Sequence, residues 1–186
     1  MIKIRKNCFE TNSSSVHAIC IDTKSLISEE KIEFNFKDFG WEEKIYDSVS
    51  SRACYLYTAI MGIGYKDEAD ERLKRLKKIL DNNNIKYSFE DAKTDSFEDN
   101  KKEYYTFDGY VDHCGELRQF IDELLSNENL LIKFLFGDSM VITGNDNCDI
   151  PFPYYIIRGN GWMEDYKKTP VKKQYEHYDK IYYKGN

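Results

Sequence analysis

The sequence predicts a single α+β domain, residues 1–186, with a mixed or antiparallel sheet and about three to four helices. Alternating apolar residues, typical of strands, occur near both ends of the chain. Helical spacing dominates much of the part between them. Strand and helix patterns follow no regular βαβ rhythm, which argues against a doubly wound α/β fold. No linker is long enough to require a second domain.

Segment 15–21 has a clear strand pattern, because His17, Ile19 and Ile21 alternate with smaller residues. Segment 31–36 places Ile32 and Phe34 on one face. The polar segment 90–102 is predicted to be an exposed loop. The other predicted strands are residues 1–6, 85–89, 103–111, 139–144, 153–159 and 179–184.

Four helical segments are predicted. Segment 41–62 is one helix, or two short helices broken at the Ser50–Ser51 pair. Segment 66–84 has the strongest pattern, with acids at its start, bases toward its end, and an apolar stripe of leucines. Residues 115–126 form a third helix, and a further helical segment begins at about Glu128.

The charge is unevenly distributed. The formal net charge is −6, but residues 166–186 carry six lysines against two acids, so the rest of the chain is strongly acidic. An acidic body makes nucleic-acid binding over most of the surface unlikely as a function class. The basic C-terminal segment is predicted to be an edge strand that faces solvent, and the alternative is that it contacts a phosphate backbone.

The five cysteines are scattered, and no CxxC pair occurs. We therefore expect reduced thiols and a cytoplasmic location. The N-terminus shows no apolar signal region. The longest mainly apolar run, residues 129–136, is too short to cross a membrane. No membrane partner is expected.

The first candidate site is the stretch "FETNSSSVHAICI", residues 9–21. Serine and asparagine turns present hydroxyls, amides and backbone N–H groups that can hold a phosphate or carboxylate. A serine near a histidine can also form a nucleophile–base pair. The alternative is a Ser/Asn turn that leads into a strand, with a semi-buried histidine. The candidate ligand-binding and catalytic residues are Asn12, Ser13, Ser14, Ser15 and His17.

The second candidate is "YVDHCGE", in which Asp112 and His113 lie between a predicted strand and a helix. His113 would be a general acid or base, and Asp112 would orient a catalytic histidine. Helix-start N–H groups favour ligands at such a junction. The alternative is that Asp112 is an N-terminal helix cap.

The third candidate is the turn that follows the predicted strand 139–144, where Asn145, Asp146 and Asn147 would position a substrate or a divalent ion. An ordinary Asn/Asp-rich turn is the alternative. The spacing of the acids does not fit a nucleotidyltransferase metal site. Zinc ligation by cysteines and histidines lacks the usual spacing, so no metal site and no cofactor is assigned.

The opening "RKNCFETNSSSVHAICI" resembles the N-terminus of a family of small phage and prophage proteins from low-GC bacteria. The blocks "FGWEE", "YLYTAI", "YVDH" and "GDSMVITGNDN" are similar to the family as well. The resemblance implies a phage-type intracellular protein, located in the cytoplasm of the host cell if a phage encodes it, and no particular activity. Ala18 stands where the family tends to have serine, and Cys114 stands where a polar residue is expected.

Two function classes follow from these patterns. The first is a domain that binds, or acts on, a small phosphorylated or nucleotide-like molecule, with the three candidate sites meeting in one polar cleft. The second is a non-enzymatic inhibitor of a host protein, such as an anti-CRISPR or other anti-defence protein, for which the acidic body and abundant tyrosines suit a protein interface. A structural or accessory phage protein is a third possibility.

Overall fold

The computed structural model describes residues 15–22, 31–40, 42, 44–97, 102–145 and 178–184. Its largest sheet has four strands in the order β10-β1-β9-β4, and every neighbouring pair is antiparallel. The strands are β1 (Ser15–Asp22), β4 (Lys44–Tyr46), β9 (Met140–Asn145) and β10 (Tyr178–Lys184). Strands β1, β9 and β10 confirm predicted strands, and β10 lies at one edge of the sheet that the described strands form. The strands predicted at 1–6 and 153–159 lie outside the described residues.

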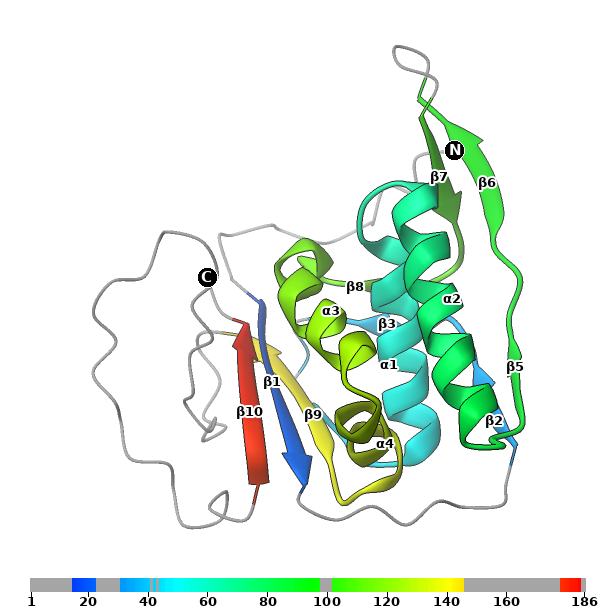
Figure 1. Cartoon of the computed structure of the whole chain (residues 1–186). Coiled ribbons are helices and arrows are strands. Elements are labelled where there is room, and N and C mark those ends of the chain that lie inside the picture. Colours follow the sequence, from blue (N-terminus) through cyan, green and yellow to red (C-terminus); the bar gives the residue numbers. More distant parts are fainter. Residues whose placement is uncertain are drawn as a thin grey trace.

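The helices lie to one side of this sheet and separate it from a second group of strands (Figure 1). The α-helices are α1 (Val49–Gly62), α2 (Lys66–Asn82), α3 (Arg118–Ser126) and α4 (Glu128–Phe136), and a short 3-10 helix, η1 (Cys114–Leu117), precedes α3. The predicted α+β class with an antiparallel sheet is therefore confirmed.

The remaining described strands form pairs. Strands β2 (Ile32–Phe34) and β5 (Tyr87–Phe89) are parallel, as are β3 (Asp38–Phe39) and β8 (Tyr110–Val111). Strands β6 (Lys93–Ser96) and β7 (Glu103–Thr106) form an antiparallel pair that extends away from the helices (Figure 1). The predicted strand 103–111 is thus two strands, β7 and β8, which belong to different pairs.

Two local predictions are wrong. The helix predicted from residue 41 begins only at Val49, because β4 pairs with β9 and the Ser48 hydroxyl caps α1 by accepting from the backbone N–H of Ser51 at 3.1 Å. The predicted exposed loop 90–102 contains strand β6, whose residues are all exposed. Pairing with β7 forms this strand, and a polar segment carries no alternating pattern that would reveal it.

Helix α1 is the centre of the core, because every residue from Arg52 to Met61 is buried. Aromatic rings pack beside it: Phe36 stacks on Phe107 at a centroid distance of 4.2 Å and on Tyr57 at 4.7 Å. A helix that is buried on all sides lacks a strong polar face, which explains why its start was hard to predict.

Arg52 is the one arginine of α1, and its side chain is buried. Its Nη2 donates to the carbonyl oxygens of Leu135 and Gly137 at 2.8 Å each, and its Nη1 donates to those of Asp47 and Ser139. A single guanidinium therefore fixes the turn between α4 and β9 against the start of α1.

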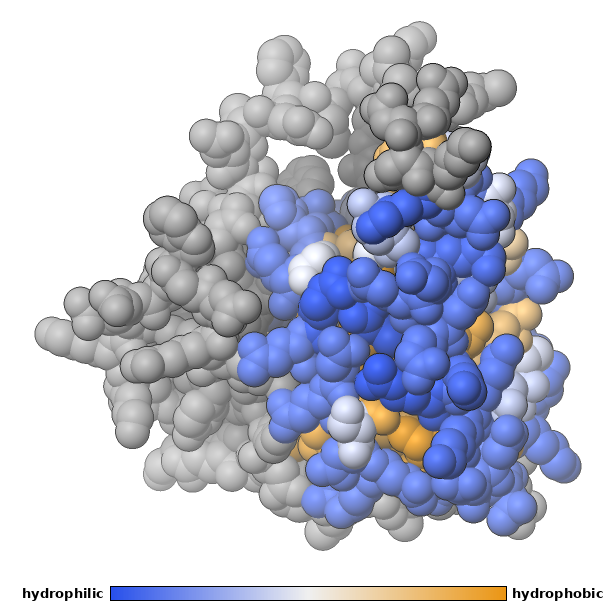
Figure 2. Space-filling model, turned by 45° about the horizontal axis from the view of Figure 1, so that its top comes forward, coloured by the Kyte–Doolittle hydropathy of each residue, from blue (hydrophilic) through white to orange (hydrophobic). Residues whose placement is uncertain are grey.

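Hydrophilic side chains cover most of the described surface on the face shown in Figure 2, with a small apolar area between them. Among the described helices, none combines the length and the apolar character needed to span a membrane.

Candidate functional site

The strand register brings two of the predicted polar turns to the same end of the four-stranded sheet. Ser15 pairs with Asn145, and His17 pairs with Thr143. Because β1 and β9 are antiparallel, β1 begins where β9 ends. We call this place the sheet end, defined by Ser15 and Asn145. The other predicted residues of the two turns lie outside the described residues: Asn12, Ser13, Ser14, Asp146 and Asn147.

His17 is fully buried beside the sheet end. Its Nδ1 lies 2.9 Å from the hydroxyl of Tyr55, which belongs to α1 and is also fully buried. Burial raises the pKa of Tyr55 well above its ordinary value, so the hydroxyl stays protonated and can donate to the imidazole. The alternative of a buried, hydrogen-bonded histidine thus describes the observed geometry. A catalytic role for His17 stays a prediction.

Neighbouring residues in this sheet are also fixed by burial. The Thr143 hydroxyl, opposite His17, donates to the carbonyl of Glu42 at 2.6 Å. Burial raises the pKa of the Cys20 thiol to about 12, so this thiol is unreactive at neutral pH. Cys20 and Cys54 are both buried, and neither forms a disulfide within the described part of the chain.

Asp112 and His113 lie at the junction between β8 and η1. The imidazole of His113 is about half exposed, with Nε2 4.0 Å from a carboxylate oxygen of Asp112 and Nδ1 3.7 Å from one of Glu116. His113 has a φ of 49°, which is uncommon for a residue other than glycine. No side chain caps η1, so the alternative of Asp112 as a helix cap is wrong.

Polar contacts on both sides hold this junction in place. The backbone N–H of Asp112 donates to the carbonyl of Phe39 at 2.9 Å, and the Cys114 thiol donates to that of Gly62 at 3.2 Å. The exposed side chain of His113 is therefore carried by a backbone that is anchored to β3 and to the end of α1.

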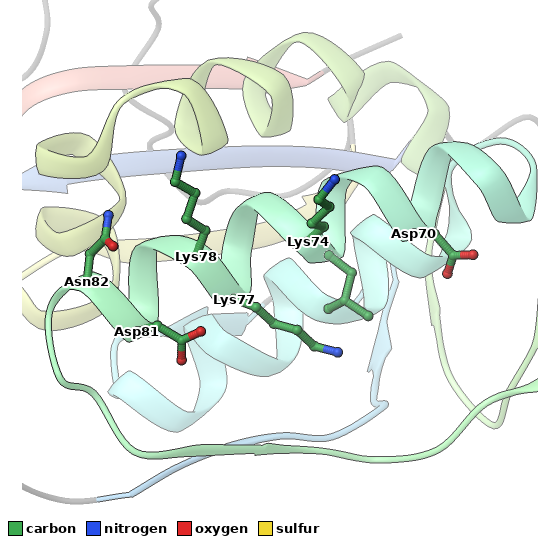
Figure 3. A pocket seen from close by; sticks show the side chains of 7 residues that line it. Asp70, Lys74, Lys77, Lys78, Asp81 and Asn82 are labelled. Carbon is green, nitrogen blue, oxygen red and sulfur yellow. The ribbon is translucent and has the colours of Figure 1, made fainter.

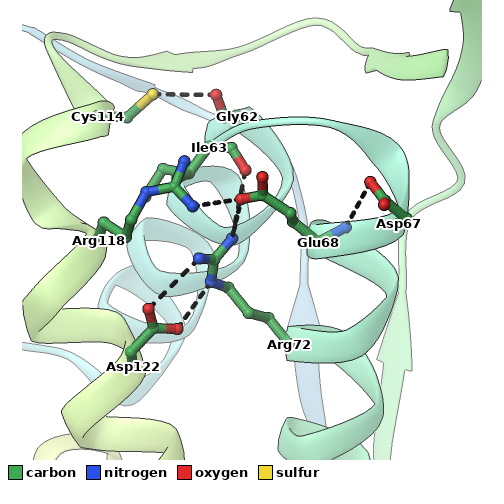
Figure 4. A network of polar contacts seen from close by, with 8 residues as sticks. All are labelled: Gly62, Ile63, Asp67, Glu68, Arg72, Cys114, Arg118 and Asp122. Atoms are coloured by element: carbon green, nitrogen blue, oxygen red, sulfur yellow. Dashed lines mark hydrogen bonds and ion pairs between the residues drawn. The ribbon is translucent and has the colours of Figure 1, made fainter. Parts of the chain in front are cut away.

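Charged side chains fasten α3 to α2 directly after the junction (Figure 4). Arg72 forms a two-pronged contact with Asp122, with N–O distances of 2.9 and 3.4 Å. Arg118 donates to Glu68, and this hydrogen bond holds the pKa of Glu68 below its ordinary value. The network fixes α3, and with it the position of the β8–η1 junction.

The predicted residues therefore form two local groups in the described structure. His17 is linked to α1 at Tyr55, whereas Cys114, which follows His113, is linked at Gly62. Seven residues of helix separate these anchors by about 10 Å along the axis. Within the described ranges, no hydrogen bond or ion pair joins His17 to the Asp112–His113 pair. One shared polar cleft remains a prediction.

The structure adds two partners that the sequence analysis missed. Tyr55 had no signal, because a tyrosine within a helical pattern indicates only a core position. Glu116 stands three residues after His113, a spacing that brings side chains together on a helix, and this signal was available. Considering only the residues that the structure describes, no cluster of three or more His, Cys, Asp or Glu side chains could hold a metal ion.

Comparison with known proteins finds no match among family models, curated proteins or solved structures. The resemblance to phage and prophage proteins stays an expectation from the sequence.

Proposed function

We propose that this protein binds a small phosphorylated or nucleotide-like molecule at the sheet end. The observation that supports the proposal is the strand register, which pairs Ser15 with Asn145 and so brings the serine-rich stretch and the Asn145–Asn147 stretch to adjacent strands. Hydroxyl, amide and backbone N–H groups are the donors that bind phosphate oxygens. In this proposal the ligand accepts hydrogen bonds from donors of both segments.

Within this proposal His17 is a positioning residue. Its hydrogen bond to Tyr55 holds the first residues of β1 against α1, while its imidazole has no exposed surface for direct contact with a ligand in solution. Asp112 and His113 would act only if the ligand extends to the β8–η1 junction. The proposal assigns binding and no reaction.

Ligand-induced thermal stabilisation tests this function. Purified protein is heated with nucleotides, cyclic nucleotides, NAD and divalent ions, and the same panel is applied to Asn12→Ala and Ser14→Ala. A ligand that binds only the folded state raises Tm, by the equivalent of about 2.7 kcal/mol at a hundredfold excess over Kd. The exposed Ser96 of β6 provides a matched control, Ser96→Ala.

A ligand that stabilises the wild type and Ser96→Ala, but neither Asn12→Ala nor Ser14→Ala, would support binding at the sheet end. If every ligand on the panel leaves the wild-type Tm unchanged, the proposed function is wrong.

A protein interface is the second candidate function, and the β6–β7 pair favours it. Phe97, directly after β6, is 48% exposed, and its ring lies 4.5 Å from that of Tyr104 and 6.3 Å from that of Tyr65. Among the described strands, β6 and β7 pair only with each other, so each has an edge available to a further strand. Such a surface suits the inhibition of a host protein by direct contact.

Paired substitutions test this second function. Phe97→Ser is compared with Ile45→Ser, which removes the other large apolar side chain that is exposed among the described residues, on β4. A host protein is first captured with the wild-type protein and purified, and its binding to each variant is then measured by calorimetry. It should bind Ile45→Ser and fail to bind Phe97→Ser. Equal binding by both variants would exclude the β6–β7 surface.

A further inference from the structure

Helix α2 carries a basic run that contrasts with the acidic chain. Five basic residues and no acidic ones occur between positions 72 and 78, whereas the whole protein has a formal net charge of −6. Leu76 of this run is fully buried, so it lies on the face of α2 that packs against the core. The lysines of the run, Lys74, Lys77 and Lys78, are exposed.

The two arginines of the run already have acidic partners. Arg72 contacts Asp122 and Glu68, and Arg75 lies 3.6 Å from Glu71. By contrast, within the described residues, no carboxylate forms an ion pair with Lys74, Lys77 or Lys78. We call these three residues the lysine triad.

An open hollow of about 630 Å³ lies on this part of α2 (Figure 3). The lysine triad lines it together with four other residues of the helix: Asp70, Leu73, Asp81 and Asn82. Lys74 and Lys78 project to one side of α2 and Lys77 projects to the other, so that cations flank the helix on both sides.

Both acidic residues of the hollow are engaged by other groups. Asp70 accepts from Lys66 at 2.9 Å and from the hydroxyl of Tyr105 at 2.5 Å. Asp81 accepts from the hydroxyl of Tyr87 at 2.9 Å. Lys66 therefore balances the charge of Asp70, and the hydroxyls of Tyr105 and Tyr87 each occupy an acceptor site on one of these carboxylates.

Lys77 has a further contact that directs it. Its ammonium lies 5.3 Å from the centre of the Phe89 ring, on β5, within the range of a cation–π interaction. On the other side, Lys74 and Lys78 are one helical turn apart, which places their Cβ atoms about 5–6 Å from each other. The cations are thus separated along and across the helix, which suits a ligand with several negative groups better than a single anion.

We propose that the lysine triad binds a chain of phosphate groups lying along α2. This site is separate from the sheet end and does not depend on the proposed function. Ammonium groups contact phosphate oxygens with charge-assisted hydrogen bonds. The same chemistry is offered by a free polyphosphate, by a nucleoside triphosphate and by the backbone of a single-stranded oligonucleotide.

Binding measurements with these probes test the proposal. Inorganic tripolyphosphate and ATP are measured by calorimetry, and a labelled oligothymidylate by fluorescence anisotropy, at several salt concentrations. For an oligonucleotide that contacts three lysines, log K should fall with log salt with a slope of about −2. Substitution of the triad, Lys74→Ala with Lys77→Ala and Lys78→Ala, should weaken binding by roughly tenfold or more.

The matched control removes three exposed lysines elsewhere: Lys31→Ala with Lys44→Ala and Lys93→Ala. It lowers the net charge equally, so a general loss of positive charge would weaken binding in both variants. Circular dichroism confirms that α2 stays folded in the triad variant.

Each outcome decides the proposal. Binding of tripolyphosphate that only the triad variant loses would support a free phosphate chain as the ligand, and binding of the oligonucleotide alone, lost in the same way, would support a nucleic-acid backbone. Absence of binding to all three probes, or equal loss in both lysine variants, would overturn the proposal. Binding that the triad variant keeps and Ser14→Ala loses belongs to the sheet end and would overturn it too.

Discussion

The Nδ1 atom of His17 lies 2.9 Å from the hydroxyl of Tyr55, and this hydrogen bond joins β1 to α1 inside the core. Both side chains are completely buried. Because the four-stranded sheet and the helices meet here, the contact holds the first half of β1 against α1.

Removing the hydroxyl tests this contact. Tyr55→Phe keeps the ring but takes a partner from the buried imidazole, so we expect the free energy of unfolding to fall by about 1–3 kcal/mol. Urea unfolding followed by circular dichroism measures the change. Tyr104→Phe removes a hydroxyl at the partly exposed β7 strand and should change stability by less than about 0.5 kcal/mol. Equal effects of the two substitutions would contradict the structural role of His17.

Arg52 provides a second prediction. Replacement by methionine keeps much of the apolar volume but removes the donors to four carbonyl oxygens around the α4–β9 turn. We expect a loss of about 3 kcal/mol or more, since buried carbonyls without donors cost about 1–3 kcal/mol each. Arg52→Lys should recover only part of this stability, because one ammonium cannot reproduce the planar fork. An Arg52→Met protein as stable as the wild type would disprove the assignment.

The contact between Arg72 and Asp122 should couple α2 to α3. The arginine side chain is 6% exposed and the aspartate 40%, so the pair is neither fully buried nor free in solvent. A double-mutant cycle with Arg72→Met and Asp122→Asn should give a coupling energy of about 1–2 kcal/mol, measured by chemical denaturation. The exposed Glu71–Arg75 pair is the comparison, with expected coupling of about 0.5 kcal/mol or less.

The pH dependence of stability should report on Asp70. Partial burial acts to raise its pKa, but hydrogen bonds from Tyr105 and Lys66 together hold the pKa below the ordinary value. The stabilisation is therefore present above the unfolded-state pKa of about 3.9, and it is lost as the pH falls through the lower folded-state value. We expect the stability difference between wild type and Asp70→Asn to shrink as the pH falls from about 6 toward 3.

Urea unfolding at a series of pH values measures this difference. Asp38→Asn serves as the control, because Asp38 is exposed and forms no ion pair with the other residues that the structure describes. If the free energies of unfolding of wild type and Asp70→Asn differ by a constant amount over the whole pH range, the hydrogen bonds leave the titration of Asp70 unaffected.

Local patterns in the sequence were sufficient for elements whose two faces differ. Strand β2 and helix α2 have such patterns, since a period of two or of 3.6 residues separates buried from exposed side chains. The same patterns were missing or misleading in β4 and β6, which exist because another strand pairs with them. Backbone pairing depends on a partner distant in the chain, and side-chain polarity does not record it.

The candidate site divides in the same way. The sequence by itself determined which residues carry suitable chemistry, because hydroxyls, imidazoles and carboxylates are properties of single residues. Only the tertiary structure decided that Ser15 lies opposite Asn145, that His17 is buried against Tyr55, and that His113 is exposed at a separate junction. These relationships join positions up to 130 residues apart, since Ser15 and Asn145 meet only through the pairing of β1 with β9. The physical reason is that burial and register are set by packing between distant segments, whereas propensity and charge are local.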